Sequence, residues 1–109
     1  MLVSYSDAFK RQLKRLNRKY RRIRSDVEPL ITQLEAGETP GDQIQGTGYT
    51  VYKVRVKNSD AQRGKSGGYR VIYYLATQDS VLLVSIYSKT EQSDIDDAEV
   101  ARIISEEES

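Results

Sequence analysis

The chain has 109 residues, with 17 Lys and Arg, 16 Asp and Glu, and a formal net charge of +1. This length predicts one domain over residues 1–109. The sequence contains no Cys and no His, which excludes disulfides, thiolate or imidazole metal ligands, and His-based acid–base catalysis. No apolar run reaches the roughly 18–20 residues of a membrane span, and the N-terminus lacks a signal-peptide pattern. We therefore expect a soluble cytoplasmic protein without a membrane partner.

The net charge hides an uneven distribution. Residues 1–78 contain 15 basic and 7 acidic side chains, whereas residues 79–109 contain 2 basic and 9 acidic ones. An asymmetry of this size is typical of a polyanion-binding surface, although two solvated faces of a small domain would also produce it.

The predicted elements begin with a short strand at 2–5, which is followed by two helices. Ser6 can cap the first helix. Its apolar stripe has the helical spacing of four, three, four and three, at Phe9, Leu13, Leu16, Tyr20 and Ile23. The second stripe lies at Val27, Leu30, Ile31 and Leu34, and Gly37 can end it. The break falls at Asn17 or near Ser25, and we expect a helical hairpin.

The polar side of the first helix is strongly cationic, because nine Lys and Arg residues lie between Lys10 and Arg24 with no acidic residue among them. Such a surface can bind a nucleic-acid backbone without reading its sequence, or attract an acidic partner protein. The residues that we expect to contact a nucleic-acid backbone here are Lys14, Arg15, Arg18 and Arg22.

A Gly- and Pro-containing loop is predicted at 37–48, and three strands follow it. In the first, from about 49 to 57, Tyr52, Val54 and Val56 face one way, whereas Lys53, Arg55 and Lys57 face the other. A second strand is predicted at 69–76. A third, at 81–87, is apolar on both faces and therefore central.

The last predicted element is a helix with apolar positions at Val100, Ile103 and Ile104. Acidic residues precede it at Asp94, Asp96, Asp97 and Glu99. Acidic side chains favour the N-terminal end of a helix, so we interpret this cluster as a helix start and not as a metal site. No metal or other cofactor is expected.

These elements predict an α+β fold of the order β-α-α-β-β-β-α. The three late strands have short connections and should pair as an antiparallel meander, giving a four-stranded, mainly antiparallel sheet with the first strand added to it. We expect the N-terminal helical hairpin and the short C-terminal helix to cover one face of this sheet, in two layers.

The side of the predicted strand at 49–57 that carries Lys53, Arg55 and Lys57 is the candidate functional surface. Lys53, Arg55 and Lys57 would emerge about 6.6–6.8 Å apart, which roughly matches successive phosphates of an extended nucleic acid. RNA supplies its own nucleophile, the 2′-hydroxyl, so a protein with Arg for charge stabilisation and Lys for proton transfer can cleave it. The alternative is a charged strand that only keeps one sheet face solvated. Aromatic candidates for base stacking or for core packing are Tyr69, Tyr73, Tyr74 and Tyr87.

Three segments resemble the RelE/ParE superfamily of bacterial toxins, and its HigB-like branch most. They are YKVRV at 52–56, RGKSGGYRVIYY at 63–74 and IYSKTE at 86–91. The resemblance implies a RelE-like fold and the toxin of a type II toxin–antitoxin pair. It implies a ribosome-dependent, metal-independent mRNA endonuclease that halts translation. The implied partners are a cognate antitoxin, the 70S ribosome with mRNA, and operator DNA through the antitoxin complex alone.

By position, Lys53 and Arg55 match the catalytic basic pair of the family, Arg70 the arginine that grips the scissile phosphate, and Lys89 a basic residue after the last strand. Further RNA contacts are expected from Lys57, Arg63 and Lys65. The sequence departs from the RelE pattern at Thr90, where an arginine would stand, and no tyrosine follows in the last segment. Either Arg63 and Lys65 compensate or Glu91 acts as base. Two alternatives remain, a ParE-like inhibitor of DNA gyrase without catalysis and a non-catalytic RNA- or ribosome-binding module.

Overall fold

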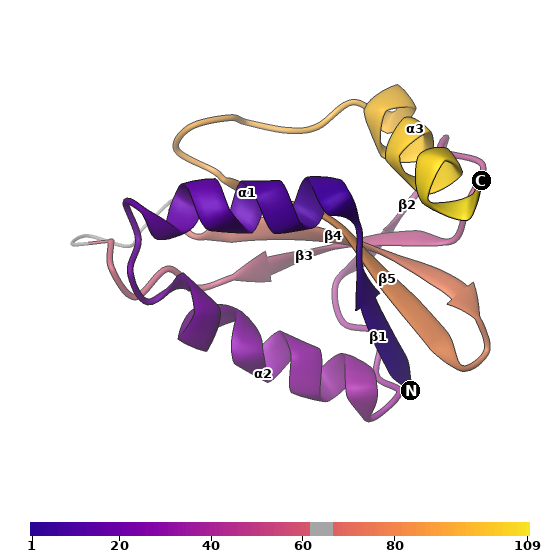
Figure 1. Ribbon diagram of the computed structural model, residues 1–109, viewed down its shortest axis with the longest axis horizontal. Coiled ribbons are helices and arrows are strands. Elements are labelled where there is room, and N and C mark those ends of the chain that lie inside the picture. The colour runs from indigo at the N-terminus through magenta and orange to yellow at the C-terminus, as the bar shows by residue number, and fades with distance from the viewer. Residues whose placement is uncertain (62–66) are drawn as a thin grey trace.

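The computed structural model describes residues 1–61 and 67–109, and these two ranges contain three helices and five strands (Figure 1). In chain order they are β1 (Leu2–Tyr5), α1 (Asp7–Asn17), α2 (Ile23–Glu35), β2 (Asp42–Ile44), β3 (Val51–Val56), β4 (Tyr69–Thr77), β5 (Ser80–Ser88) and α3 (Asp97–Glu108). The predicted α+β class is confirmed. None of the helices in these ranges combines the length and apolar character that crossing a bilayer requires.

The strands form one sheet in the order β1-β5-β4-β3-β2. β1 runs parallel to β5, whereas the other neighbouring pairs are antiparallel. The late strands therefore form the predicted meander, and β1 joins its β5 edge. β5 lies between β1 and β4 and is buried along nearly its whole length, which confirms the interpretation of its apolar run as an interior strand.

β2 is a fifth strand that the sequence analysis assigned to a loop. Its three residues show no apolar alternation, so periodicity could not reveal it. The strand forms because β3 offers an open edge, where Asp42 pairs with Lys53 and Ile44 with Val51. Gly41 precedes it with φ +93°, and a Cβ there would collide with the backbone oxygen of Lys53. Glycine is therefore required for this close approach.

The two N-terminal helices meet at the earlier of the two predicted breaks. α1 ends at Asn17 and α2 begins at Ile23, so Ile23 belongs to the second helix and not to the first. The Ser6 hydroxyl accepts a hydrogen bond from the backbone N–H of Phe9 at 2.9 Å, which confirms the predicted cap. Gly37 follows α2 with φ +90°, a conformation that commonly ends helices.

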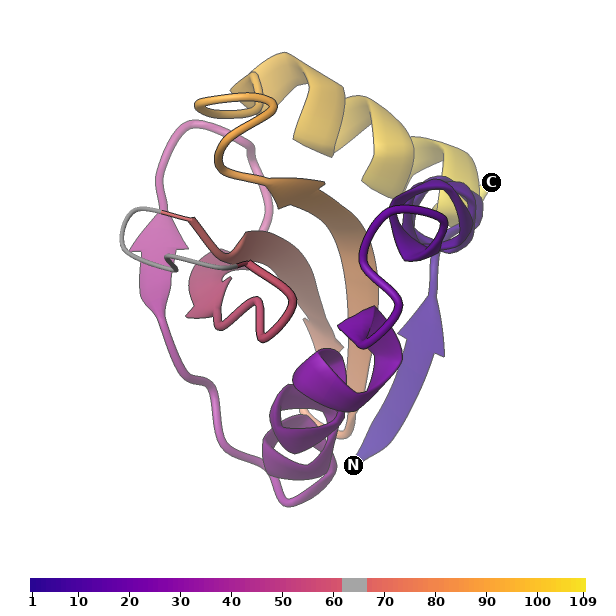
Figure 2. The ribbon, with the colours of Figure 1, turned by 90° about the vertical axis from the view of Figure 1, so that its left-hand side faces the viewer.

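Helices lie on both faces of the sheet, because the described residues form two apolar clusters. In the first, Phe9 of α1 and Leu34 of α2 pack with Val71 of β4. In the second, Ile104 of α3 packs with the neighbouring Ile72, which points to the opposite face. Figure 2 shows α2 and α3 on opposite sides of the sheet. The prediction that the helices cover one face is therefore wrong for α3, because its apolar stripe does not specify which face it covers.

α1 covers part of the edge of β5. β1 pairs with Ser80–Leu83, so the rest of this edge has no strand neighbour within residues 1–61 and 67–109. The Ser6 hydroxyl donates to the carbonyl of Val84 at 2.7 Å, and Oε1 of Gln12 accepts from the backbone N–H of Ile86 at 2.8 Å. The helix thus supplies hydrogen bonds that another strand would otherwise make.

Replacing Gln12 should destabilise the fold, because Gln12→Ala leaves the buried N–H of Ile86 without its partner. We expect a loss of about 1–3 kcal/mol in the free energy of unfolding, measured by urea denaturation. Gln33→Ala, at an exposed position of α2, is the matched control and should change stability by less than about 0.5 kcal/mol. Equal effects of the two substitutions would contradict the role of Gln12 at this edge.

Candidate RNA-binding and catalytic site

Three neighbouring strands bring functional side chains into one row across the sheet. Arg55 of β3 lies opposite Arg70 of β4, and Arg70 lies opposite Tyr87 of β5. Directly paired residues point to the same face, and Lys53 shares it because side chains alternate along a strand. Arg55 is exposed, whereas Lys53 and Arg70 are half-buried. Lys53, Arg55 and Arg70 are called the cationic face below.

α3 packs beside the cationic face and leaves it open. Ile72 lies opposite Lys53 in the strand register and is fully buried in the cluster that contains α3. Two residues away on the same strand face, Arg70 retains access to solvent. One end of this sheet face is therefore apolar and covered, and the other is charged and accessible to a ligand.

Arg55 and Arg70 are like charges held directly opposite each other. Such a pair is destabilising unless an anion lies between or above the two side chains. In the described ranges neither guanidinium has a carboxylate within 4.0 Å, and the one hydrogen bond of Arg70 goes to the backbone oxygen of Tyr69 at 3.3 Å. Both groups keep donors available, and two guanidinium forks can bind the oxygens of a phosphate.

Asp94 is the carboxylate that contacts the cationic face. Its Oδ1 accepts hydrogen bonds from Nζ of Lys53 at 3.1 Å, from the hydroxyl of Tyr87 at 3.3 Å and from the backbone N–H of Ile95 at 2.8 Å. Sequence analysis grouped Asp94 with the acidic residues at the start of the last helix. The N-cap residue is Asp96, although its side chain makes no cap hydrogen bond, so Asp94 lies in the preceding connection, which brings it to Lys53.

The protonation states of Asp94 and Tyr87 follow from these contacts. The backbone N–H of Ile95 and the ammonium of Lys53 hold the pKa of Asp94 below its ordinary value. Burial, together with the Asp94 carboxylate, raises the pKa of Tyr87 to about 12, although the positive charge of Arg70 opposes this shift. At neutral pH Asp94 is therefore an anion and Tyr87 a protonated donor.

The other acidic residues near α3 do not join Asp94. Asp96 is the N-cap residue of α3, and Glu99 pairs with Arg102 of the same helix at 2.7 Å. No three Asp or Glu side chains within residues 1–61 and 67–109 come close enough together to hold a metal ion. The acidic cluster thus serves the helix and, through Asp94, the cationic face.

The remaining predicted cations lie around this face or outside the described residues. Lys57 is exposed just after the end of β3. Lys89 directly follows β5; its backbone N–H donates to the carbonyl of Gly68 at 3.0 Å, and its ammonium donates to the carbonyl of Ser93 at 2.7 Å. Two predicted contacts fall outside the described ranges, Arg63 and Lys65.

The predicted RNA-binding residues of the first helix segment are all exposed; they are Lys14, Arg15, Arg18 and Arg22. Arg15 and the neighbouring Lys19 bind the two oxygens of Glu91, at 3.3 and 3.7 Å. Glu91, which sequence analysis offered as a base, is thus held by α1. Asp94, and not Glu91, is the carboxylate placed against Lys53.

The aromatic candidates are mostly core residues. Tyr69 and Tyr73 are 0% exposed, so of the two interpretations core packing is confirmed and base stacking is excluded for these two residues. Tyr73 stacks on Tyr52 with ring centroids 5.3 Å apart. Tyr74 is half-buried, and its hydroxyl donates to Glu108. Tyr87 is buried as well and presents its hydroxyl to Asp94.

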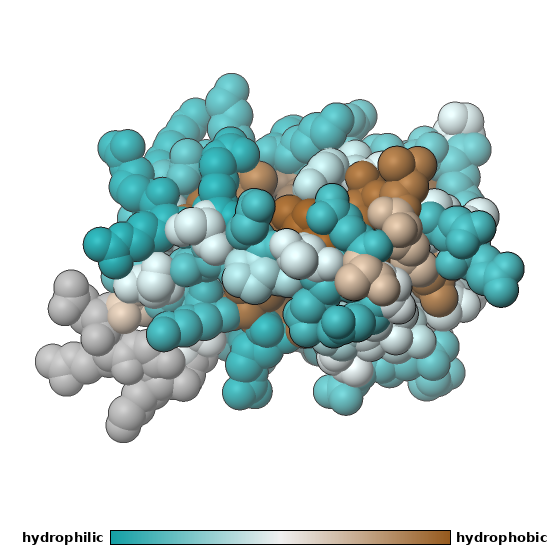
Figure 3. Space-filling view, turned by 90° about the horizontal axis from the view of Figure 1, so that it is seen from below, coloured by the Kyte–Doolittle hydropathy of each residue, from teal (hydrophilic) through white to brown (hydrophobic). Residues whose placement is uncertain are grey.

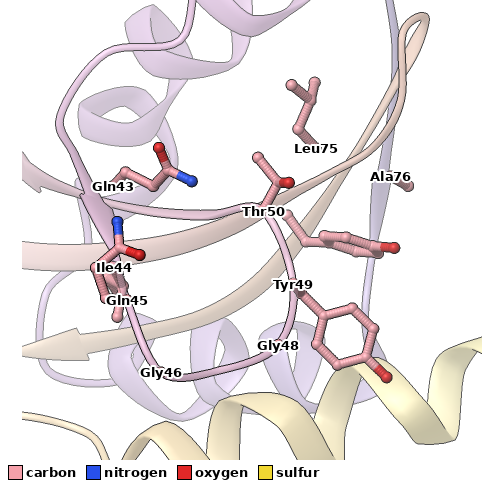
Figure 4. A pocket seen from close by; sticks show the side chains of 10 residues that line it. Gln43, Ile44, Gln45, Gly46, Gly48, Tyr49, Thr50, Leu75 and Ala76 are labelled. Atoms are coloured by element: carbon pink, nitrogen blue, oxygen red, sulfur yellow. The ribbon is translucent and has the colours of Figure 1, made fainter.

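Two hollows lie apart from the cationic face. A cavity of about 550 Å³ lies between the loop that follows β2 and the far end of β4, and none of its lining residues is charged (Figure 4). A groove of about 360 Å³ between α1 and α2 has an apolar floor that includes Phe9, Leu13 and Val27. Seen from the α2 side, the molecule is mostly hydrophilic, with hydrophobic residues showing between the polar ones (Figure 3). The groove is also lined by Lys10, Arg24 and Glu28, whereas the cavity beside β2 has no charged lining residue.

Comparison with known protein families agrees with this architecture. Residues 8–106 match the sequence profile described as the RelE toxin of the RelE/RelB toxin–antitoxin system. The match spans most of the chain, so this protein belongs to the RelE toxin family. It is the toxin component of a toxin–antitoxin system, and the family implies an antitoxin partner. The resemblance noted in the sequence is confirmed at this level, and the HigB-like branch stays a prediction.

The contact between Lys53 and Asp94 can be tested by titration. In Lys53→Met the pKa of Asp94 should rise, because the ammonium is lost, and stay below its ordinary value, because the Ile95 N–H remains. Carboxyl ¹³C NMR between about pH 2 and 6 measures this shift. Lys57→Met, which removes a charge with no carboxylate within 4.0 Å in the described ranges, is the control. An unchanged pKa in Lys53→Met would contradict the ion pair.

The same shift gives a pH dependence of stability. The pKa of Asp94 is lower in the folded than in the unfolded chain. Its contribution to the free energy of unfolding is therefore present above the unfolded pKa and is lost as the pH falls through the folded pKa. The Asp94 side chain is 65% exposed, so we expect this contribution to be small. Lys53→Met should therefore leave stability at pH 7 nearly unchanged.

Proposed function

We propose that this toxin is a ribosome-dependent mRNA endonuclease, an mRNA interferase, in which residues 1–109 act as one toxin domain in the cytoplasm. One observation carries the proposal. Arg55 and Arg70 lie directly opposite each other on an open sheet face, and no described carboxylate neutralises them. This arrangement is unfavourable in the free protein and favourable when a phosphodiester binds.

The proposed reaction is attack of the RNA 2′-hydroxyl on the adjacent phosphorus. The bond from the 2′-oxygen to phosphorus forms, the bond to the 5′-oxygen breaks, and one proton passes from the first oxygen, through a base and an acid, to the second. Arg70 grips the scissile phosphate, and Arg55 helps to neutralise the charge that develops on it. Lys53, which shares the sheet face of Arg55 and Arg70, is the proposed acid, and Lys89 adds positive charge at the end of β5.

Dependence on the ribosome follows from the openness of the site. The cationic face binds phosphate charge, and a nucleotide must in addition be held in line for attack, because alignment accounts for much of the rate of such reactions. The ribosome would hold the mRNA in the required conformation. The exposed cations of α1 and of the turn that follows it, with Lys57, would contact RNA phosphates without reading sequence.

The antitoxin is expected to cover the cationic face. An acidic segment of the antitoxin would neutralise Arg55 and Arg70 and exclude RNA from them. We propose that operator DNA binds the complex through the antitoxin. No membrane partner is proposed.

Primer extension on an mRNA, with and without programmed ribosomes, tests this function. We expect cuts within codons only when ribosomes are present. Arg70→Ala should reduce cleavage by about 100-fold or more, because it removes a donor to the charge of the transition state. The control is Arg102→Ala, which removes an exposed arginine of α3 paired with Glu99 and Glu106, and it should cleave normally.

Ribosome binding distinguishes an enzyme from a binding module. Arg70→Ala should still sediment with ribosomes, because the other exposed cations remain. No cleavage by the wild type, together with inhibition of DNA gyrase, would instead assign the chain to the ParE-like alternative. Binding to ribosomes without cleavage would assign it to a non-catalytic module.

A further inference from the structure

We propose that Asp94 is an intramolecular substitute for the RNA phosphate, which occupies the donors of Lys53 and Tyr87 until RNA displaces it. Lys53 and the hydroxyl of Tyr87 would then form one binding site for a phosphodiester oxygen. This inference rests on the proposed function, since it takes RNA as the ligand. It adds a competing residue, Asp94, and a phosphate donor, Tyr87.

The geometry of the contact resembles that of a bound anion. A single oxygen, Oδ1 of Asp94, accepts from Nζ of Lys53 at 3.1 Å and from the hydroxyl of Tyr87 at 3.3 Å. Tyr87 lies opposite Arg70 in the strand register, so one of the two donors to this oxygen comes from the residue that is paired with the arginine proposed to grip the phosphate. A phosphate oxygen is an acceptor of the same charge and can replace a carboxylate oxygen at these donors.

The contact is also easily exchanged. The side chain of Asp94 is 65% exposed and that of Lys53 is 35% exposed, and ion pairs at such exposure are weak. In contrast, the Tyr87 side chain is buried, being 3% exposed, and its hydroxyl has Asp94 as its acceptor among the described residues. Removal of Asp94 without a replacement would leave a buried donor unpaired, whereas an incoming phosphate would satisfy it.

The connection that carries Asp94 has its own supports. The side-chain amide of Gln92 donates to the backbone carbonyl of Asp94 at 2.9 Å, and the ammonium of Lys89 donates to the carbonyl of Ser93 at 2.7 Å. The backbone N–H of Ile95 can bond to an Asn side chain as it does to Asp94. Asp94→Asn should therefore preserve the fold of this segment while removing the negative charge.

The test compares Asp94→Asn with Asp96→Asn. The control, Asp96→Asn, removes one negative charge as Asp94→Asn does, but at a neighbouring residue whose side chain forms no ion pair in the described ranges. The probe is a fluorescent 2′-O-methyl RNA dodecamer, which cannot be cleaved because its 2′-oxygen is blocked. Dissociation constants are measured by anisotropy at one fixed salt concentration. We expect Asp94→Asn to bind about two- to fivefold more tightly than Asp96→Asn, the range for release of an exposed ion pair.

A double substitution tests the mechanism. In Lys53→Met the further change Asp94→Asn should give a smaller gain over Asp96→Asn than it gives with Lys53 present, because the ion pair with Lys53 is already broken and the contact with Tyr87 is the one that remains to be displaced. Equal affinities of the two single Asn variants would overturn the proposal, and so would weaker binding by Asp94→Asn, which would make Asp94 a positioning residue for Lys53. Failure of all variants to bind would also overturn it.

The measurement is independent of the cleavage assay. It uses neither ribosomes nor a cleavable RNA, so a chain that fails to cut mRNA can still show the difference between the Asn variants. Conversely, if the wild type cuts mRNA while Asp94→Asn and Asp96→Asn bind the RNA probe with equal affinity, the proposed function stands and this inference is overturned.

Discussion

The arrangement of this protein depends on the hydrogen bonding of β5. This strand is buried on both faces and pairs with β1 on one side and β4 on the other. Where β1 ends, Ser6 and Gln12 of the α1 segment bond to its backbone. Buried backbone groups must be paired, so α1 has to lie along this edge. With β5 satisfied in this way, β4 and β3 follow in register, and that register sets Arg55 opposite Arg70.

The electrostatics of the cationic face follow from that register. Two guanidinium groups held opposite each other weaken the sheet. Of the three cations of the cationic face, Lys53 is the one that is paired with a carboxylate, Asp94, among the residues that the structure describes. The remaining field attracts an anion, which suits a toxin whose proposed substrate is RNA and whose family implies an antitoxin partner.

Local patterns predicted much of this site. Alternation along β3 placed Lys53 and Arg55 on one face, and the resemblance of the GGYR segment brought Arg70 into consideration. Asp94 was missed because it stands in an acidic run, where nothing in the local pattern separates it from Asp96. Tyr87 was considered for stacking, and its hydroxyl contact with Asp94 could not be foreseen from an apolar strand. Which carboxylate contacts Lys53 depends on the path of the connection after β5, which directs Asp94 to Lys53 and Glu91 to Arg15.

The sequence by itself determined the helices, the long strands and the side of β3 that carries the cations, because these follow from the backbone geometry of consecutive residues. The tertiary structure alone decided the pairing of β2 with β3, the face covered by α3, and the contact of Lys53 with Asp94, 41 residues away. Each of these depends on which open edge, apolar face or charge another segment presents after the chain has folded back. Periodicity carries no information about such partners, because it describes only neighbours along the chain.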